Sequence, residues 1–378
     1  MSELHPNVQL ALDTILQQDR QGIPSWMIHL MEHRHIERLA GSPEGSYRRD
    51  PDRTYLAMQQ AVGTCLLDQW IPRNPLEMGT TGYEGRERGA TTGAEEIILD
   101  DIVINSPEAV IEHIEQVLFP AIQKQIASFD EEQRVREILT QEASLQKVLG
   151  SSILKTGYAF VSFPSLSYYQ YGYTPYFTAY ALYPEIMERC FSLQADLALL
   201  NNTAATHAYT EGHLPPFYRL DHDMADSRGT LPSIGSLDRL WFPHLARCLD
   251  PLVRAGVRLI WHCDGNLMAM VPRLLEAGVS GFQGFQYEDG MDYRRICAMR
   301  ARSGEELLII AGVSVTRTLP FGGPQDVKSE LDFLVSNGPK RGLFLACSSS
   351  VAPGVSWENI RTLVEGLAYY RVHGRTDV

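Results

Sequence analysis

The sequence lacks the features that mark several large classes of protein. No apolar run approaches the roughly 18 residues that a membrane-spanning helix needs. The six cysteines lie far apart and form no C-x-x-C pair, which argues against a disulfide framework and favours a reducing compartment. The N-terminal residues are polar and have no signal-peptide core, so we expect a cytoplasmic protein.

Basic residues are also in the minority. The 378 residues include 33 Lys or Arg against 46 Asp or Glu, which gives a formal net charge of −13. Without clusters of basic residues, this balance argues against nucleic acid and anionic membranes as partners. The hydrophobic fraction of 44% and the charged fraction of 21% are typical of a globular protein with a sizeable core.

The first 150 residues are mainly helical in pattern. Apolar residues at three- and four-residue spacing predict helices over 6–22, 24–40, 52–72, 106–127 and 130–149. We therefore predict that residues 1–150 form a helical elaboration packed on the main domain.

One segment of this N-terminal part departs from the helical pattern. Residues 79–94 are rich in Gly and Thr, which indicates turns and a short hairpin. This segment could act as a lid or as a docking place for a partner, and a solvated loop is the default reading.

From residue 151 to residue 378 the pattern changes to short apolar strands that alternate with helices. About five such units are visible, and neither a G-x-G-x-x-G nor a Walker motif follows any strand. The alternation without a nucleotide-binding motif favours a (β/α)8 TIM barrel over a doubly wound sheet. We predict that residues 151–378 form the main part of this barrel and that the whole chain is one structural domain.

The polar residues that end the apolar strands are the candidates for a site, because active sites of such barrels lie at the C-terminal strand ends. In RLIWHCDGN, His262 and Asp264 are two residues apart, so both can face one side of the strand while Cys263 faces the other. Cys347 ends a later strand and could face the same space. Together these three could hold catalytic zinc. Alternatively, His262 and Asp264 are a hydrogen-bonded pair and Cys347 is a buried apolar residue.

Other candidates have weaker support. Asp223 ends a strand in a polar run and could act as an acid or base, or only as a turn cap. Gln286 and Glu288 follow a strand and could contact substrate or support His262. Tyr180 belongs to a Tyr-rich stretch over 168–183 that could line a substrate pocket, although packing explains most of these rings equally well.

Four segments resemble a known family when they are taken together and in order. They are LDHDMADSRGTLPS, LIWHCDGN, LLIIAGVSVTRTLPFGGPQDVKSEL and GLFLACSSSVAPGVSWENIRTLVEGLAYY. The chain resembles the uroporphyrinogen decarboxylase superfamily, and most of all its branch of cobalamin-dependent methyltransferases, of the methylcobalamin:coenzyme M type. The resemblance covers residues 150–370 well and the first 150 loosely.

The resemblance implies a (β/α)8 barrel in which zinc, held by His-x-Cys and a later Cys, activates a thiol that accepts a methyl group. His262 matches the His and Cys347 the later Cys, whereas Asp264 stands where the first Cys is usual. Asp264 and Cys347 would still neutralise Zn²⁺, although a carboxylate is a harder ligand than a thiolate. No corrinoid-binding Asp-x-His-x-x-Gly motif occurs, so the corrinoid would come from a carrier protein. The chain could act as a homodimer.

Two other functions remain open. A metal-free lyase, such as a uroporphyrinogen decarboxylase, would use Asp223 or Asp264 as proton carrier. Its polyanionic substrate needs several fixed cations, but PSWMIHLMEHRHIERLAG offers Arg34 and Arg38 without the Arg-rich motif of that family. The third possibility is a non-catalytic barrel that binds a ligand or a partner.

Overall fold

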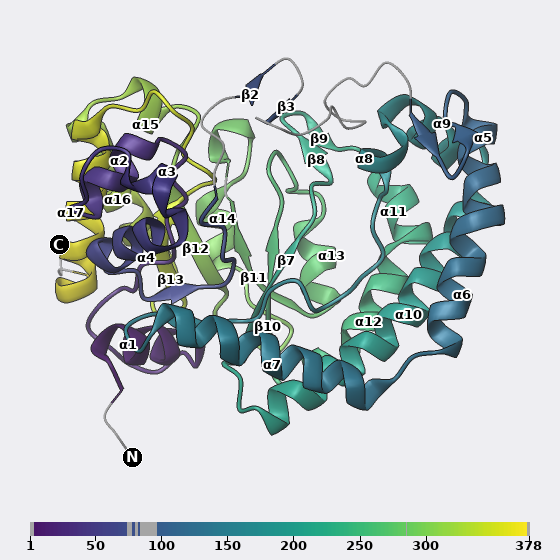
Figure 1. Cartoon of the computed structure of the whole chain (residues 1–378), viewed down its shortest axis with the longest axis horizontal. Helices are drawn as coiled ribbons and strands as arrows, with labels where there is room; N and C mark the ends of the chain where they lie inside the picture. The colour runs from purple at the N-terminus through teal and green to yellow at the C-terminus, as the bar shows by residue number, and fades with distance from the viewer. Residues whose placement is uncertain (1–3, 74–77, 80–81, 84–96, 285, 376–378) are drawn as a thin grey trace.

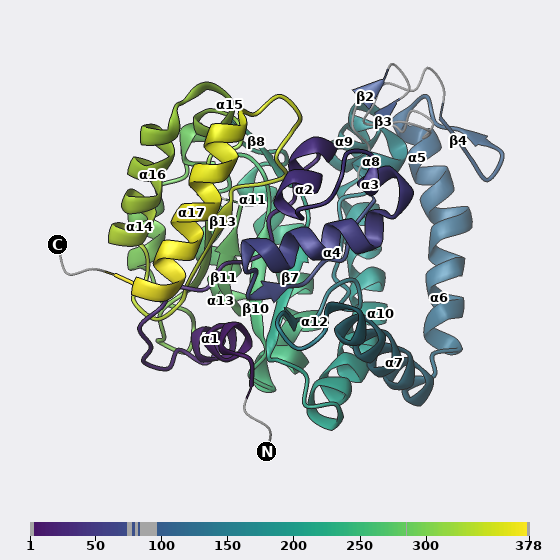
Figure 2. The same cartoon turned by 60° about the vertical axis from the view of Figure 1, so that its left-hand side comes forward.

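The computed structural model describes residues 4–73, 78–79, 82–83, 97–284 and 286–375, so most of segment 79–94 lies outside the described residues. The chain is a mixed α/β protein with a parallel sheet in its centre and helices around it (Figures 1 and 2). The α/β class predicted from the strand–helix alternation is therefore confirmed.

The central sheet contains five parallel strands in the order β13-β12-β11-β10-β7. Their bounds are Phe217–Asp221 (β7), Arg258–His262 (β10), Val279–Gln283 (β11), Leu308–Val313 (β12) and Leu343–Cys347 (β13). Each lies where the sequence predicts a strand. Helices connect them, namely α11 (Ile234–Leu240), α12 (Phe242–Arg254), α13 (Val271–Glu276), α14 (Tyr293–Ala298), α15 (Thr318–Phe321), α16 (Pro324–Asn337) and, after β13, α17 (Trp357–His373).

The N-terminal part of the chain adds parallel segments to both edges of this sheet. Strand β1 (Leu66–Leu67) pairs with β6 (Leu154–Lys155), and Gly157 just after β6 pairs with Tyr218 of β7. On the other side, Trp26 pairs with Leu66, and Ser25 pairs with Leu345 of β13. Within the described residues, eight parallel segments are thus linked from one edge of the sheet to the other. These pairings also cross residue 150, the predicted boundary.

The helix predicted over 24–40 is wrong in its first part. Residues 25–30 form extended bridges, and only His33–Leu39 is helical (α2). The run PSWMIHLM is buried almost throughout, and a fully buried strand shows no alternation that would distinguish it from a helix. The helix predicted over 52–72 is also wrong in its last part, because a short buried strand shows no alternation. The segment forms two elements. It contains α4 (Pro51–Val62), which ends at Gly63 with a φ of +75°, and then β1.

The remaining helices surround the sheet (Figures 1 and 2). The side chains of Asp50, Ser106 and Asp130 accept hydrogen bonds from the first turns of α4, α5 and α7. The bounds are Pro6–Ile15 (α1), Ser46–Arg49 (α3), Pro107–His113 (α5), Ile114–Leu118 (π-helix η1), Phe119–Ala127 (α6), Glu131–Leu149 (α7), Tyr168–Tyr171 (α8), Tyr173–Leu182 (α9), Pro184–Glu211 (α10) and Tyr287–Asp289 (3₁₀-helix η2). Three short antiparallel pairs are β2 (Met78–Gly79) with β3 (Gly82–Tyr83), β4 (Ile98–Leu99) with β5 (Ile102–Val103), and β8 (Ala225–Asp226) with β9 (Gly229–Thr230).

The strands separate two apolar clusters, because neighbouring residues of a strand face opposite sides. The outer cluster, between strands and helices, includes Leu259, Trp261, Leu343 and Leu345. The inner cluster includes, from the strands, Phe217, Ile260, Leu308, Ile310, Phe344 and Ala346, and from α1, Val8, Ala11 and Ile15. Helix α1 lies beneath the strands in Figure 1, so it covers the inner cluster at their N-terminal end. Helix α1 does not cover the C-terminal end of the strands, so a functional site can lie there.

All six cysteines are free and buried, as the absence of a disulfide pattern predicts. Among the helices that the structure describes, none combines the length and the apolar character that crossing a membrane would require.

Candidate functional site

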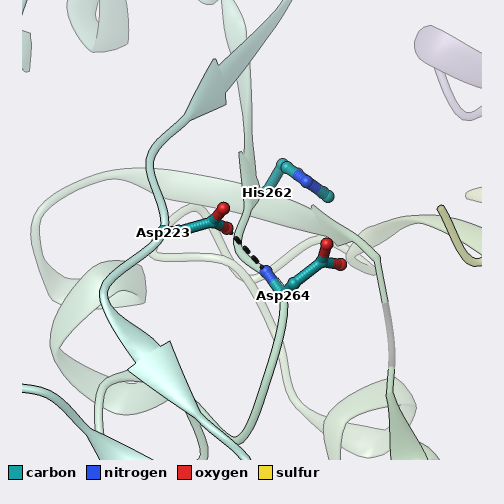
Figure 3. Close-up of side chains that lie close together, drawn as sticks. All are labelled: Asp223, His262 and Asp264. Atoms are coloured by element: carbon teal, nitrogen blue, oxygen red, sulfur yellow. Dashed lines mark hydrogen bonds between the residues drawn. The ribbon is translucent and has the colours of Figure 1, made fainter. Parts of the chain in front are cut away.

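Asp223, His262 and Asp264 come together at the C-terminal ends of two neighbouring strands (Figure 3). One potential ligand atom from each residue lies within 4.8 Å of those from the other two. His262 is the last residue of β10 and pairs with Asp221, the last residue of β7. Asp223 and Asp264 each follow two residues beyond these strand ends. The register of one strand pair therefore brings the three side chains together.

Backbone hydrogen bonds hold the loops that carry the two carboxylates. The Asp264 N–H donates to Asp223 Oδ1 at 2.9 Å, and the Gly265 N–H donates to Gln286 Oε1 at 2.7 Å. Gly265 has a φ of +89°, and a Cβ there would lie 2.7 Å from the carbonyl oxygen of Asp226. Only glycine allows this close approach without strain. The two loops therefore support each other.

Two atoms of this group are buried without a partner. Within the described part of the chain, neither His262 Nδ1 nor Asp264 Oδ1 has a hydrogen-bond partner. Such buried polar atoms normally have one, so an orphan needs an explanation such as an ion. One imidazole and two carboxylates are good donors for Zn²⁺ and similar ions, and two carboxylates neutralise a divalent charge. The residues present therefore fit a divalent metal.

The environment of Asp264 raises the pKa of its carboxyl group above the ordinary value. Burial is the largest cause, His262 opposes it, and the nearby carboxylates of Asp223 and Asp221 add to it. Burial and neighbouring negative charge both disfavour the ionised form. The site therefore holds the ionised Asp264 carboxylate at a free-energy cost that a bound cation would relieve.

The two cysteines near the site lie in the outer cluster. Cys263 is buried there as strand alternation predicts, its Sγ accepts a hydrogen bond from the Met224 N–H at 3.2 Å, and burial raises its thiol pKa to about 12. Cys347 is 2% exposed in the same cluster, and burial raises its pKa well above the ordinary value. Cys347 shares the parity of Leu343 and Leu345, which face the helices. The expected ligand set is corrected accordingly, because the structure brings Asp223 to His262 and Asp264 and leaves Cys347 apart.

Of the three residues predicted to bind substrate, Gln286 and Tyr180 contact different groups. Gln286 is half-buried and supports the loop of Asp264 through Gly265. Tyr180 lies on α9, donates its hydroxyl hydrogen to Ser236 Oγ at 3.2 Å and packs against Phe191. It does not line the cavity described below. The side chain of Glu288 lies outside the described residues.

A cavity of about 120 Å³ opens beside His262. Residues from the C-terminal ends of several parallel segments line it, namely Trp26, Met27, His29, Gln69, Ile71, Arg219, Asp221, His262, Gln283, Ser349 and Ser350. Trp26 and Met27 also belong to the inner cluster, so the cavity lies above the apolar interior that the strands enclose. Ligands of α/β proteins with parallel sheets bind at this end of the strands.

Arg219 is the buried centre of the cavity wall. Its Nε donates to Asp68 Oδ2 at 2.6 Å, its Nη1 to Asp221 Oδ2 at 2.8 Å and its Nη2 to Gln69 Oε1 at 3.1 Å. Burial alone would lower the pKa of Arg219, but Asp68 and Asp221 more than offset it and the net shift is upward.

Asp221 connects this network with His262. Its Oδ1 lies 3.9 Å from His262 Nε2, and its Oδ2 also accepts a hydrogen bond from the Tyr158 hydroxyl at 3.2 Å. Burial raises the pKa of Asp221, but His262 and Arg219 together hold it below the ordinary value. Asp221 is therefore an ionised group that faces the imidazole.

The sequence reasoning missed Arg219, Asp68, Gln69 and Trp26 as site residues. Arg219 did carry a signal, because an Arg in the middle of the apolar strand FYRL needs a buried counter-ion. The other three come from the part of the chain that was predicted as helical, so their pattern gave no strand end to search.

Comparisons with known proteins support the fold. No protein-family model matches the chain, and no curated protein sequence matches it. Among solved structures, a methyltransferase from Methanosarcina mazei superposes with a TM-score of 0.56, covering 97% of this chain and 99% of that one at 13% sequence identity. At this low identity the match concerns architecture, so the chain shares the fold of that methyltransferase over nearly its whole length.

Proposed function

We propose that the protein is a metal-dependent methyltransferase that moves a methyl group between a corrinoid and a small acceptor. The observation that carries the proposal is the convergence of His262, Asp264 and Asp223 beside a cavity at the C-terminal strand ends. The fold shared with a methyltransferase supports it. The eight linked parallel segments support a (β/α)8 barrel as the scaffold.

Zinc is the metal that we propose for His262, Asp264 and Asp223. The ion would supply a Lewis acid that lowers the pKa of the acceptor. The residues of the chain perform the other tasks. Asp221 faces His262 and is fixed by Arg219 and Tyr158, an arrangement that orients a metal-binding imidazole in many proteins. Without a thiolate ligand the site is harder than a cysteine-containing one, so oxygen and nitrogen acceptors suit it as well as thiols.

The corrinoid is proposed to come from a separate carrier protein, because the sequence has no Asp-x-His-x-x-Gly motif of its own. The partners would then be this carrier and a small methyl acceptor or donor. A cytoplasmic location and a homodimer remain part of the proposal.

Metal analysis tests this function directly. We expect protein purified without chelator to contain about one zinc ion per chain. The His262→Ala and Asp264→Asn variants should lose it, while Cys347→Ser should keep it. Methyl transfer from methylcobalamin to a small thiol, alcohol or amine should follow the metal content across these variants. A metal content near zero in the unsubstituted protein would refute the proposal.

A metal-free lyase is the second candidate, and the raised pKa of Asp264 favours it. A half-buried carboxyl group whose pKa is raised keeps its proton to a higher pH than an ordinary aspartate, which suits a proton donor to a carbanion. The size of the cavity and the pairing of Arg219 with two carboxylates argue against a polyanionic porphyrinogen. Decarboxylation of uroporphyrinogen or a small acid by chelator-treated protein, lost in Asp223→Asn, would support this alternative.

A further inference from the structure

The cavity beside His262 has an excess of negative charge. Among the described residues that line it, Arg219 is the only Lys or Arg. Asp221 lines the same cavity, Asp68 contacts Arg219 from behind, and Asp264 lies next to His262. Even if a divalent ion neutralised the carboxylates of the metal site, Asp68 and Asp221 would outweigh the one guanidinium.

The charge of Arg219 is already paired with two carboxylates, Asp68 and Asp221. Three of its five N–H groups donate to Asp68, Asp221 and Gln69. Its guanidinium group also lies over two aromatic rings, 5.3 Å from the centre of Trp26 and 5.1 Å from that of Tyr158. An anionic ligand would therefore meet one guanidinium whose charge two carboxylates already offset, and drawing Arg219 away from either of them would leave a buried carboxylate without its counter-ion.

The cavity wall instead offers hydrogen-bond acceptors. Gln283 lines the cavity and is 3% exposed, and its Oε1 has no partner among the residues that the structure describes. The amide orientation follows from Nε2, which donates to the Ser348 carbonyl oxygen at 3.2 Å. Asp221 Oδ1 is the second acceptor, and His262 Nε2 lies 3.9 Å from it, beyond hydrogen-bond distance. A ligand that donates hydrogen bonds would satisfy both.

The volume limits the size of this ligand. A cavity of about 120 Å³ is slightly smaller than the roughly 150 Å³ engineered cavity that holds one benzene molecule. Molecules of four or five heavy atoms therefore fit.

We propose that this cavity binds a small hydrogen-bond donor without negative charge, that is, a short alcohol or amine, and rejects carboxylates, sulfonates and phosphates of the same size. This inference rests on the proposed function, because it names the class of small molecule that would exchange the methyl group. It concerns Asp221 and Gln283 rather than the metal ligands.

Three probes of nearly equal size separate charge from shape, namely ethanolamine, ethylene glycol and glycolate. Their binding is measured by ligand-observed NMR on the full-length protein, once loaded with zinc and once after chelation. We expect ethanolamine and ethylene glycol to bind, and glycolate to bind at least about tenfold more weakly than ethanolamine, a factor equal to about 1.4 kcal/mol. The inference is overturned if glycolate binds as tightly as ethanolamine or if none of the three binds.

Two variants assign the preference to the proposed residues. Asp221→Asn should remove most of the difference between ethanolamine and glycolate. Gln283→Leu should weaken both donor probes several-fold and keeps the inference testable if Asp221→Asn misfolds. Asp226→Asn, which removes a carboxylate outside the cavity, is the matched control and should leave all three affinities unchanged. An unaltered charge preference in both test variants would contradict the proposal.

The outcomes for this inference and for the methyltransferase are separable. A preference for donors in protein that contains no zinc would support the cavity chemistry and refute the metal site. Zinc bound at His262 together with tight binding of glycolate would support the metal site and refute the proposed preference of the cavity.

Discussion

The inner and outer faces of the same strands differ in chemistry at their C-terminal ends. On the inner face, Asp221, His262 and Gln283 line a polar cavity. On the outer face, Cys263 directly follows His262 and Cys347 ends β13. Both are buried among apolar side chains, which raises the pKa of their thiols. The side of the sheet that a residue faces, more than its type, decides whether it can act as a ligand.

The largest effect expected from this comparison is on stability. Arg219→Met should reduce the free energy of unfolding by about 3–5 kcal/mol, because Asp68 stays buried without its counter-ion. Chemical denaturation measures this. Adding Asp68→Leu should restore part of the loss. The matched control is Arg228→Met, whose exposed pair with Asp226 should contribute little to stability. Equal effects of the two Arg substitutions would contradict this description of the inner face.

The second largest effect is expected on zinc affinity, which should fall for a substitution on the inner face of the strands and stay nearly constant for one on the outer face. Asp264→Asn should lower it by roughly 100-fold or more, since even partners outside the ligand set contribute about 10- to 100-fold. Cys347→Ser should change it less than about twofold, as the thiol faces the helices. Competition with a metal indicator gives both values. A large loss in Cys347→Ser would restore the ligand set predicted from the sequence.

The outer face has its own titratable group, Glu330 of α16. Burial raises the pKa of Glu330 from 4.5 to about 7, although the Ser314 N–H donates to its Oε1. The folded protein therefore binds one more proton than the unfolded chain between these values, so stability falls as the pH rises through this window.

Glu330→Gln should remove this pH dependence, which amounts to a change on the order of 2 kcal/mol. Denaturation at pH values on both sides of the window measures it. Glu365→Gln, an exposed acid on α17, is the control and should keep the slope. If the slope is the same with and without Glu330, the group titrates normally.

The smallest expected effect concerns the support of Asp264. Gln286→Ala removes the acceptor of the Gly265 N–H and should lower zinc affinity by up to about tenfold. Stability should fall by only about 1 kcal/mol. Gln116→Ala, on the exposed face of η1, is the control for both measurements. No change in zinc affinity would mean that the loop keeps its position without this hydrogen bond.

The sequence predicted the five central strands because each is short, apolar and followed by a helix with clear periodicity. It failed over residues 24–31, where PSWMIHLM is buried on both faces and lacks alternation. Trp26 was missed as a site residue for the same reason. Asp68 and Gln69 were missed because they follow β1, which is too short to show a strand pattern. Pairings between segments cross residue 150, because Ser25 pairs with Leu345 of β13 and β1 pairs with β6.

Local alternation alone determined that His262 and Asp264 are separated in direction from Cys263, because a strand fixes the side of each residue relative to its neighbours. Alternation within one strand does not show whether His262 of β10 and Cys347 of β13 face the same side of the sheet. Nor does it show that the loop after β7 lies next to the loop after β10. Those relations depend on register between strands that lie far apart in the chain. The tertiary structure therefore decided that Asp223, and not Cys347, joins His262 and Asp264.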